Sequence, residues 1–138
     1  AGMLVGARLS GYQGKILGIS VDEPAEILTD RVANLAMETA AFIGEDFHYS
    51  SEDMLVDDGY TGGGYAVMGR PEVEAIRLFA QKEALLLDPV YTGRAAAGLI
   101  DLIQKGKFKP TETVLFWHTG GGQALFADRY QGRLLANK

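Results

Sequence analysis

Two short segments of this chain combine polar side chains with glycines in ways that could support chemistry. The first, residues 88–93, reads Asp-Pro-Val-Tyr-Thr-Gly and provides the phenol of Tyr91 and the hydroxyl of Thr92. A phenol can act as acid, base or hydrogen-bond donor once its surroundings lower its pKa. The second, residues 118–122, reads His-Thr-Gly-Gly-Gly, and its backbone N–H groups suit an anion or a polar ring edge. From spacing alone, packing explains the tyrosine better than catalysis does, and a tight turn explains the glycines as well as a ligand does.

A third candidate is the irregular, glycine-rich stretch at residues 45–69. Tyr60 and Tyr65 lie on either side of three consecutive glycines within it. The stretch exceeds ordinary connection lengths, and long ordered loops are often functional, so we predict an active-site loop region at 45–69. Each tyrosine could either present an aromatic ring to a ligand or pin the loop to the surface. Asp57 and Asp58 lack the alternating ligands of a calcium loop, which favours a solvated acidic turn.

Composition excludes several classes of function. The net charge of −5, from 13 Lys plus Arg against 18 Asp plus Glu, opposes binding to nucleic acid. With no cysteine and only two histidines, we expect no disulfide, no thiolate nucleophile and no metal site. No serine lies in a nucleophile elbow, and no paired-carboxylate motif is evident. Without a signal peptide or an apolar run of about 20 residues, we expect no membrane partner and a cytoplasmic location.

The hydrophobic pattern predicts strands that alternate with helices. Strands are predicted at residues 15–21, 84–87 and 113–117, and helices at 1–10, 70–83, 92–105 and 123–128, with a further helix opened by Pro24 and closed by Gly44. This order predicts the α/β class, with a mostly parallel sheet between two helical layers, in a single unit covering residues 1–138. The helix at the first residue has no capping residue before it, so we expect a chain cut from something longer.

Both chemistry-bearing segments directly follow predicted strands. In open α/β sheets, ligands bind beyond the carboxyl ends of the strands. The residues therefore predict a cleft lined by tyrosines, threonines and glycines, and leave its ligand open.

Residues 86–102 and 114–126 closely resemble the C-terminal part of the D-cysteine desulfhydrase and 1-aminocyclopropane-1-carboxylate (ACC) deaminase family. These are pyridoxal-phosphate enzymes of the tryptophan-synthase-β-like fold (fold type II), and the resemblance covers essentially the whole chain. It implies the C-terminal part of the large cofactor-binding domain, pyridoxal 5'-phosphate as cofactor, a small amino-acid substrate and a homodimeric full-length enzyme.

The resemblance also assigns site residues. Tyr91 resembles the family tyrosine near cofactor and substrate, and Tyr65 the second active-site tyrosine, which implies catalytic roles. Thr92, Thr119 and Gly120 take cofactor-binding positions. Deaminases carry glutamate and leucine where this chain has its two threonines, whereas desulfhydrases carry threonines.

A neutral hydroxyl beside the cofactor ring should leave it a weaker electron sink, adequate to eliminate a good leaving group. We therefore expect a carbon-sulfur lyase, D-cysteine desulfhydrase, that forms pyruvate, hydrogen sulfide and ammonia. L-cysteate sulfo-lyase and ACC deaminase are the alternatives. The loop at 61–65 departs from the Gly-Pro-Gly-Tyr form of the desulfhydrases, and Met68 replaces an expected proline, which leaves the substrate open.

In this family the Schiff-base lysine and the phosphate loop lie upstream of the matched region. No lysine of this chain lies in a context resembling that catalytic lysine. We therefore expect a C-terminal portion of a lyase that is not competent alone. The alternative from another class is a non-catalytic α/β ligand-binding module.

Overall fold

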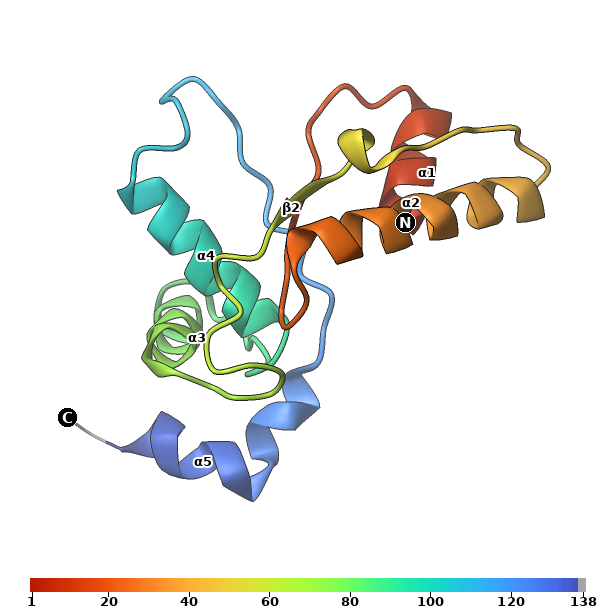
Figure 1. Ribbon diagram of the computed structural model, residues 1–138. Coiled ribbons are helices and arrows are strands. Elements are labelled where there is room, and N and C mark those ends of the chain that lie inside the picture. Colours follow the sequence, from red (N-terminus) through yellow and green to blue (C-terminus); the bar gives the residue numbers. More distant parts are fainter. Residues whose placement is uncertain (137–138) are drawn as a thin grey trace. The chain divides into compact units, whose positions relative to one another are not determined.

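The computed structural model describes residues 1–136 and divides into two compact units, Ala1–Gly59 and Tyr60–Lys138 (Figure 1). Each unit contains helices, and the parallel sheet lies in the first. Within the described range, no helix is both long enough and apolar enough to cross a membrane.

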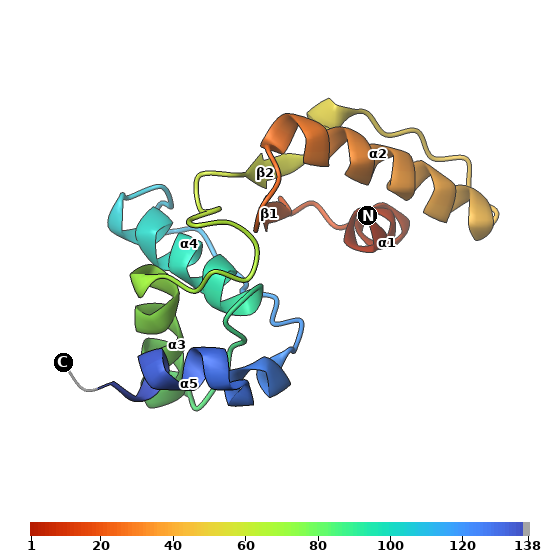
Figure 2. The ribbon, with the colours of Figure 1, turned by 60° about the horizontal axis from the view of Figure 1, so that its bottom comes forward.

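The first unit builds two helices around a small parallel sheet. Its elements are α1 (Gly2–Ser10), β1 (Leu17–Ile19), α2 (Ala25–Phe42), η1 (Ser51–Asp53) and β2 (Leu55–Asp57). Leu17 pairs with Leu55 and Ile19 with Asp57, and the two strands lie side by side near one end of α2 in both views (Figures 1 and 2). The strand predicted at 15–21 and the helix after Pro24 are confirmed. β2 lies inside the stretch that we expected to be irregular.

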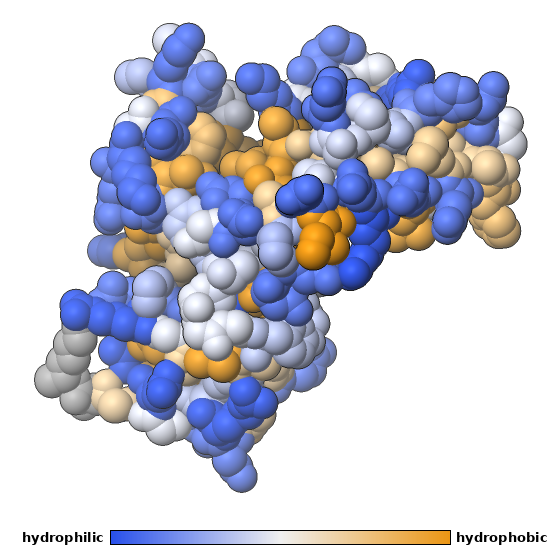
Figure 3. Space-filling model, in the orientation of Figure 1, coloured by the Kyte–Doolittle hydropathy of each residue, from blue (hydrophilic) through white to orange (hydrophobic). Residues whose placement is uncertain are grey.

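Small side chains form the core of the first unit. Val5 of α1 packs with Ala36 and Ala40 of α2, and all three are almost fully buried. Larger apolar residues of α2 face outward: Leu35 is 51% exposed and Phe42 is 92% exposed. Figure 3 shows hydrophobic residues between hydrophilic ones on the surface around α2.

The second unit is helical. Its elements are α3 (Arg70–Glu83), α4 (Thr92–Gln104), η2 (Gly122–Phe126) and α5 (Asp128–Leu135). α3 packs on α4 and contacts α5 (Figure 2), around a core that includes Ile76, Leu87 and Tyr130. The helices predicted at 70–83 and 92–105 are confirmed, whereas α5 was not predicted.

The strands predicted at 84–87 and 113–117 are not strands in this structure. Both segments are extended or irregular, and Leu86, Leu115 and Trp117 are 55%, 73% and 60% exposed. An apolar strand needs a neighbouring strand for its backbone and cover on both faces. Among the described residues, only β1 and β2 pair. The α/β class is confirmed by this small parallel sheet with its helices. The prediction of two further strands, at 84–87 and 113–117, is wrong.

Candidate functional site

The two tyrosines predicted to be catalytic meet in the second unit. The hydroxyls of Tyr65 and Tyr91 are hydrogen-bonded to each other, and their rings pack edge to face with centroids 6.0 Å apart. Tyr65 comes from the loop before α3, and Tyr91 from the turn that opens α4. Both side chains are about half exposed, so a ligand in solvent can reach the pair. The structure thus brings the two residues together, and their catalytic roles stay predictions.

Asp88 builds the turn that carries Tyr91 and Thr92. Its carboxylate is buried and accepts the backbone N–H groups of Tyr91 and Thr92, each at 2.8 Å. In return, the Asp88 N–H donates to Thr92 Oγ1 at 2.8 Å. These reciprocal bonds cap the N-terminus of α4. The N–H groups of Tyr91 and Thr92, at the start of α4, are therefore engaged by a carboxylate and are not offered to an anionic ligand.

The start of α4 lies directly against the backbone of Asp88. The Gly93 N–H donates to the Asp88 carbonyl oxygen at 2.8 Å, and a Cβ at Gly93 would lie only 2.5 Å from that oxygen. Only glycine allows this approach. Thr92, the residue before Gly93, is 97% buried (3% exposed) beside this close contact.

The second predicted segment lies against the first. A Cβ at Gly121 would be 2.9 Å from the Asp88 Cβ, so the glycine turn packs on the Asp88 side chain. Gly120 has a φ of +95°, and a Cβ there would meet nothing within 4 Å. Thr119 and His118 are exposed. The turn therefore packs on Asp88 at Gly121 and is uncrowded at Gly120.

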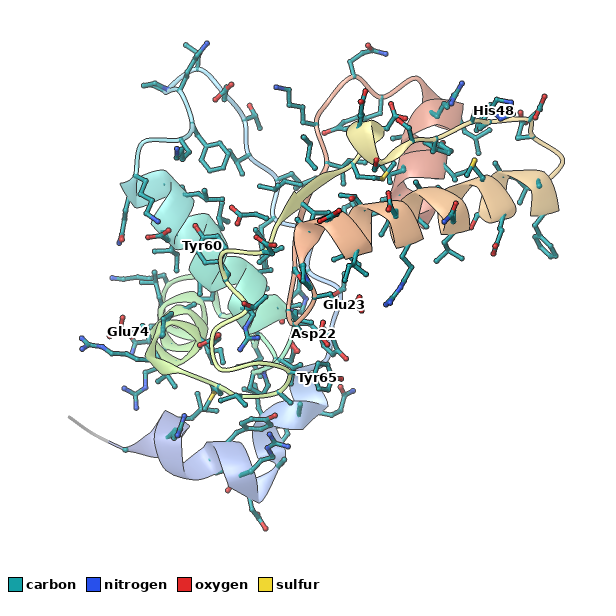
Figure 4. The ribbon with its side chains drawn as sticks, viewed as in Figure 1. Asp22, Glu23, His48, Tyr60, Tyr65 and Glu74 are labelled. Atoms are coloured by element: carbon teal, nitrogen blue, oxygen red, sulfur yellow. The ribbon has the colours of Figure 1, made fainter. Side chains whose placement is uncertain are left out.

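Tyr60 follows the structural interpretation rather than the ligand-binding one. Its hydroxyl donates to Asp101 Oδ2 at 2.6 Å, which pins the start of the loop to α4. Lys105, 2.6 Å from the same oxygen, and Tyr60 together hold the pKa of Asp101 below its ordinary value. Figure 4 shows Tyr60 against α4 and Tyr65 farther along the same segment.

The acidic pair also has a structural role. Asp57 Oδ1 accepts the Gly59 N–H at 2.9 Å, and Asp58 Oδ2 accepts the Ala25 N–H at 2.7 Å, at the start of α2. Asp58 therefore stabilises a helix N-terminus.

Sequence reasoning missed a buried ion pair beside the site. Arg94 Nε lies 2.8 Å from Glu72 Oε1, and the two side chains are only 1% and 6% exposed. Buried charges are rare unless paired. The sequence does carry a signal for it. Arg94 stands between glycine and alanines in a predicted helix, so its charge falls within an otherwise apolar segment.

The comparisons with known proteins agree on one family. The family described as pyridoxal-phosphate dependent enzyme matches residues 1–120 of the chain. A probable ACC deaminase of Cryptococcus neoformans var. neoformans serotype D is 37% identical over 92% of this chain and 37% of its own length. An ACC deaminase of Burkholderia cenocepacia is 35% identical over 92% of this chain and 38% of its own.

A solved structure described as an ACC deaminase homologue covers 97% of this chain and 39% of its own, with a TM-score of 0.79 and 32% identity. The chain thus spans well under half the length of these relatives. Their names agree with the alternative, ACC deaminase, rather than with D-cysteine desulfhydrase. The match over 1–120 shows the family and its cofactor, pyridoxal phosphate. This chain therefore belongs to the family of pyridoxal-phosphate dependent enzymes.

Proposed function

We propose that the chain forms the C-terminal part of a lyase that converts a small amino acid to a 2-oxo acid and ammonia. One observation carries the proposal: the meeting of Tyr65 and Tyr91 hydroxyls next to the turn that holds Thr92, in a chain of this enzyme family. Such a pair offers proton donors and acceptors at one point. A non-catalytic binding module has no need of that arrangement.

The residues present fit one edge of pyridoxal phosphate. Thr92 Oγ1 accepts the Asp88 N–H at 2.8 Å. The Thr92 hydroxyl donates its own proton to Asp88 Oδ1 over a long distance, 3.3 Å. A ring nitrogen would be a competing acceptor for this proton. A Cβ at Gly120 would meet nothing within 4 Å, so no neighbouring atom of the chain crowds this position. We propose that Thr92, Thr119 and Gly120 hold the ring side of the cofactor.

The phosphate group does not fit at the N-terminus of α4. Helix N-termini often bind phosphate, but here the Asp88 carboxylate takes the donors of Tyr91 and Thr92. A second anion at the same place would meet like charge. We propose that other residues of the whole protein bind the phosphate.

When bound, pyridoxal phosphate withdraws electrons from bonds at the substrate's α-carbon. The chain's own residues would then donate and accept the protons. One phenol of the Tyr65–Tyr91 pair donates to the other, so the pair can pass a proton between the loop and the α4 turn. The neutral Thr92 hydroxyl donates a hydrogen bond without adding charge.

ACC is the first substrate to test. The support is the naming of two relatives as ACC deaminases, which are 37% and 35% identical to this chain over 92% of its length. The expected products are 2-oxobutanoate and ammonia.

D-cysteine is the second candidate, and Thr92 favours it. A carboxylate at this position would favour a protonated ring nitrogen, and a hydroxyl does not. A weaker electron sink suits elimination of sulfide better than ring opening. L-cysteate, which would lose sulfite, belongs with this candidate.

The full-length enzyme should be purified with its cofactor and assayed on ACC, D-cysteine and L-cysteate. Formation of 2-oxobutanoate from ACC, with no reaction of the other two, would support ACC as the substrate. Formation of pyruvate with sulfide or sulfite would support D-cysteine or L-cysteate. Tyr65→Phe and Tyr91→Phe should each lower kcat by about a hundredfold, as expected for loss of a proton-transfer group. Tyr12→Phe is the matched control, since Tyr12 is similarly exposed (55%) and lies in the other unit. Cofactor binding without turnover of any amino acid would contradict the proposal.

A further inference from the structure

The loop that carries Tyr65 has little rigidity of its own. Residues 62–64 are three glycines, and Ala66, next to Tyr65, has a φ of +59° that side-chain-bearing residues rarely adopt. Tyr65 nevertheless places its hydroxyl on Tyr91. Two backbone bonds lie within the loop, from the Gly64 N–H to the Thr61 oxygen at 3.0 Å and from the Val67 N–H to the Gly64 oxygen at 3.3 Å, and further donors come from outside it.

Arg94 provides the donors from α4. Its Nη1 donates to the carbonyl oxygens of Thr61 at 2.8 Å and Gly64 at 3.1 Å, and its Nη2 donates to that of Val67 at 2.8 Å. These carbonyls lie on both sides of Tyr65 in the chain. One planar guanidinium thus fixes the two ends of the turn on which Tyr65 is carried.

Glu72 completes the arrangement. Its Oε1 accepts from Arg94 Nε at 2.8 Å, and its Oε2 accepts the Gly69 N–H at 2.9 Å. The carboxylate neutralises the buried guanidinium and also binds the last residue before α3. The pair therefore joins both supporting helices to the loop.

α5 binds the strained residue from the other side. Arg129 Nη2 and the Tyr130 hydroxyl donate to the Ala66 carbonyl oxygen at 2.6 Å and 3.0 Å. Arg133 donates to the carbonyl oxygen of Met68. A strained backbone persists when its surroundings over-determine it, and these bonds do so.

We propose that Arg94 is a positioning residue for Tyr65, and that the Tyr130 hydroxyl holds the Ala66 peptide in support of it. The inference rests on the proposed function of Tyr65. A lysine at position 94 could pair with Glu72, but its single ammonium group lacks the fork that reaches three carbonyls. The loop would then relax, and the Tyr65 hydroxyl would leave Tyr91.

The test uses the full-length holoenzyme with Arg94→Lys and Tyr130→Phe. In Arg94→Lys, kcat should fall by about tenfold to a hundredfold with KM nearly constant, because the misplaced phenol acts after substrate binds. Amide hydrogen exchange in residues 61–68 should accelerate by about tenfold or more, with the rest of the protein unchanged. Tyr130→Phe should show the same pattern at smaller size.

Arg70→Lys is the matched control. Arg70 makes the same kind of ion pair, 2.6 Å to Glu74, but that pair is exposed (75% and 53%). Figure 4 shows Glu74 on the outer side of α3. Both readouts should match the wild type in this variant.

Unchanged exchange in 61–68 for both Arg94→Lys and Tyr130→Phe would overturn the inference, as would faster exchange with an unchanged kcat. If Arg94→Lys fails to fold, Tyr130→Phe decides, since it removes one hydroxyl only. A wild-type enzyme that binds the cofactor but turns over no amino acid would refute the proposed function instead, and exchange in 61–68 would still decide whether Arg94 holds the loop.

Discussion

In the unit Ala1–Gly59, the ion pair Arg31–Glu23 lies at the surface, with side chains 62% and 29% exposed. In the unit Tyr60–Lys138, the pair Arg94–Glu72 is 1% and 6% exposed. The first unit packs its helices through small apolar side chains such as Ala36. In the second, the buried side chain of Arg94 donates to loop carbonyls.

The difference follows from what each unit must hold in place. Apolar burial is non-directional and suffices to pack regular helices. An irregular loop pairs fewer of its backbone carbonyls than a helix or sheet does, and directed donors can bind them. The candidate residues Tyr65, Tyr91 and Thr92 all lie in the unit with the buried ion pair. The buried ion pair and the candidate site residues therefore lie in the same unit.

The largest contrast is expected from removing the carboxylate of each ion pair. Glu72→Leu leaves the Arg94 charge buried and should cost about 3–5 kcal/mol of unfolding free energy. Glu23→Leu breaks the exposed pair and should cost about 0–1 kcal/mol. Urea unfolding of the full-length enzyme measures both, and hydrogen exchange assigns the loss to a unit. Equal costs would remove the distinction between the units.

Glycine-to-alanine changes should have opposite signs in the two units. Gly93→Ala forces a Cβ to within 2.5 Å of the Asp88 carbonyl oxygen and should destabilise by about 1–3 kcal/mol. A Cβ at Gly6 in α1 would meet nothing within 4 Å. Gly6→Ala should therefore stabilise the folded protein by about 0.5–1 kcal/mol, since alanine favours the helix. Thermal unfolding tests the sign, and stabilisation by Gly93→Ala would contradict the close approach.

The two aspartate caps should differ less. Asp88→Ala leaves the buried N–H groups of Tyr91 and Thr92 unpaired and should cost about 1–2 kcal/mol. Asp58→Ala frees only the Ala25 N–H, which water can reach, and should cost about 0.5–1 kcal/mol. Urea midpoints compare the two, and a larger cost at Asp58 would refute the role of burial.

The smallest effect is a pH dependence carried by one surface carboxylate in each unit. Lys105 and Tyr60 lower the pKa of Asp101, and the Ser50 N–H and hydroxyl lower that of Asp53. A depressed folded-state pKa adds stability above the unfolded value of about 3.9, and this stability is lost as the pH falls through the folded pKa. Asp101→Asn should therefore make the second unit less sensitive to acid, as Asp53→Asn should the first. Melting curves between about pH 2 and pH 6 test this, and unchanged acid sensitivity would show that neither contact matters.

Much of the fold was predictable because it depends on local signals. Helices α3 and α4 follow from apolar periodicity, with Pro71 near the first turn of one and Gly106 just after the other. β1 followed from its β-favouring residues. The segments at 84–87 and 113–117 carry equally clear strand patterns and form no strand, because pairing needs a neighbour that local sequence does not provide.

The candidate site divides in the same way. The sequence alone determined helices α1 to α4, the family resemblance and the candidate residues, because residue types and local patterns are written in the chain. These candidates are Tyr65, Tyr91, Thr92, Thr119 and Gly120. Only the tertiary structure decided that Tyr65 meets Tyr91 across 26 residues of chain, and that Arg94 binds the carbonyls beside Tyr65. Such contacts depend on directed bonds between distant segments, and their partners have no local signature.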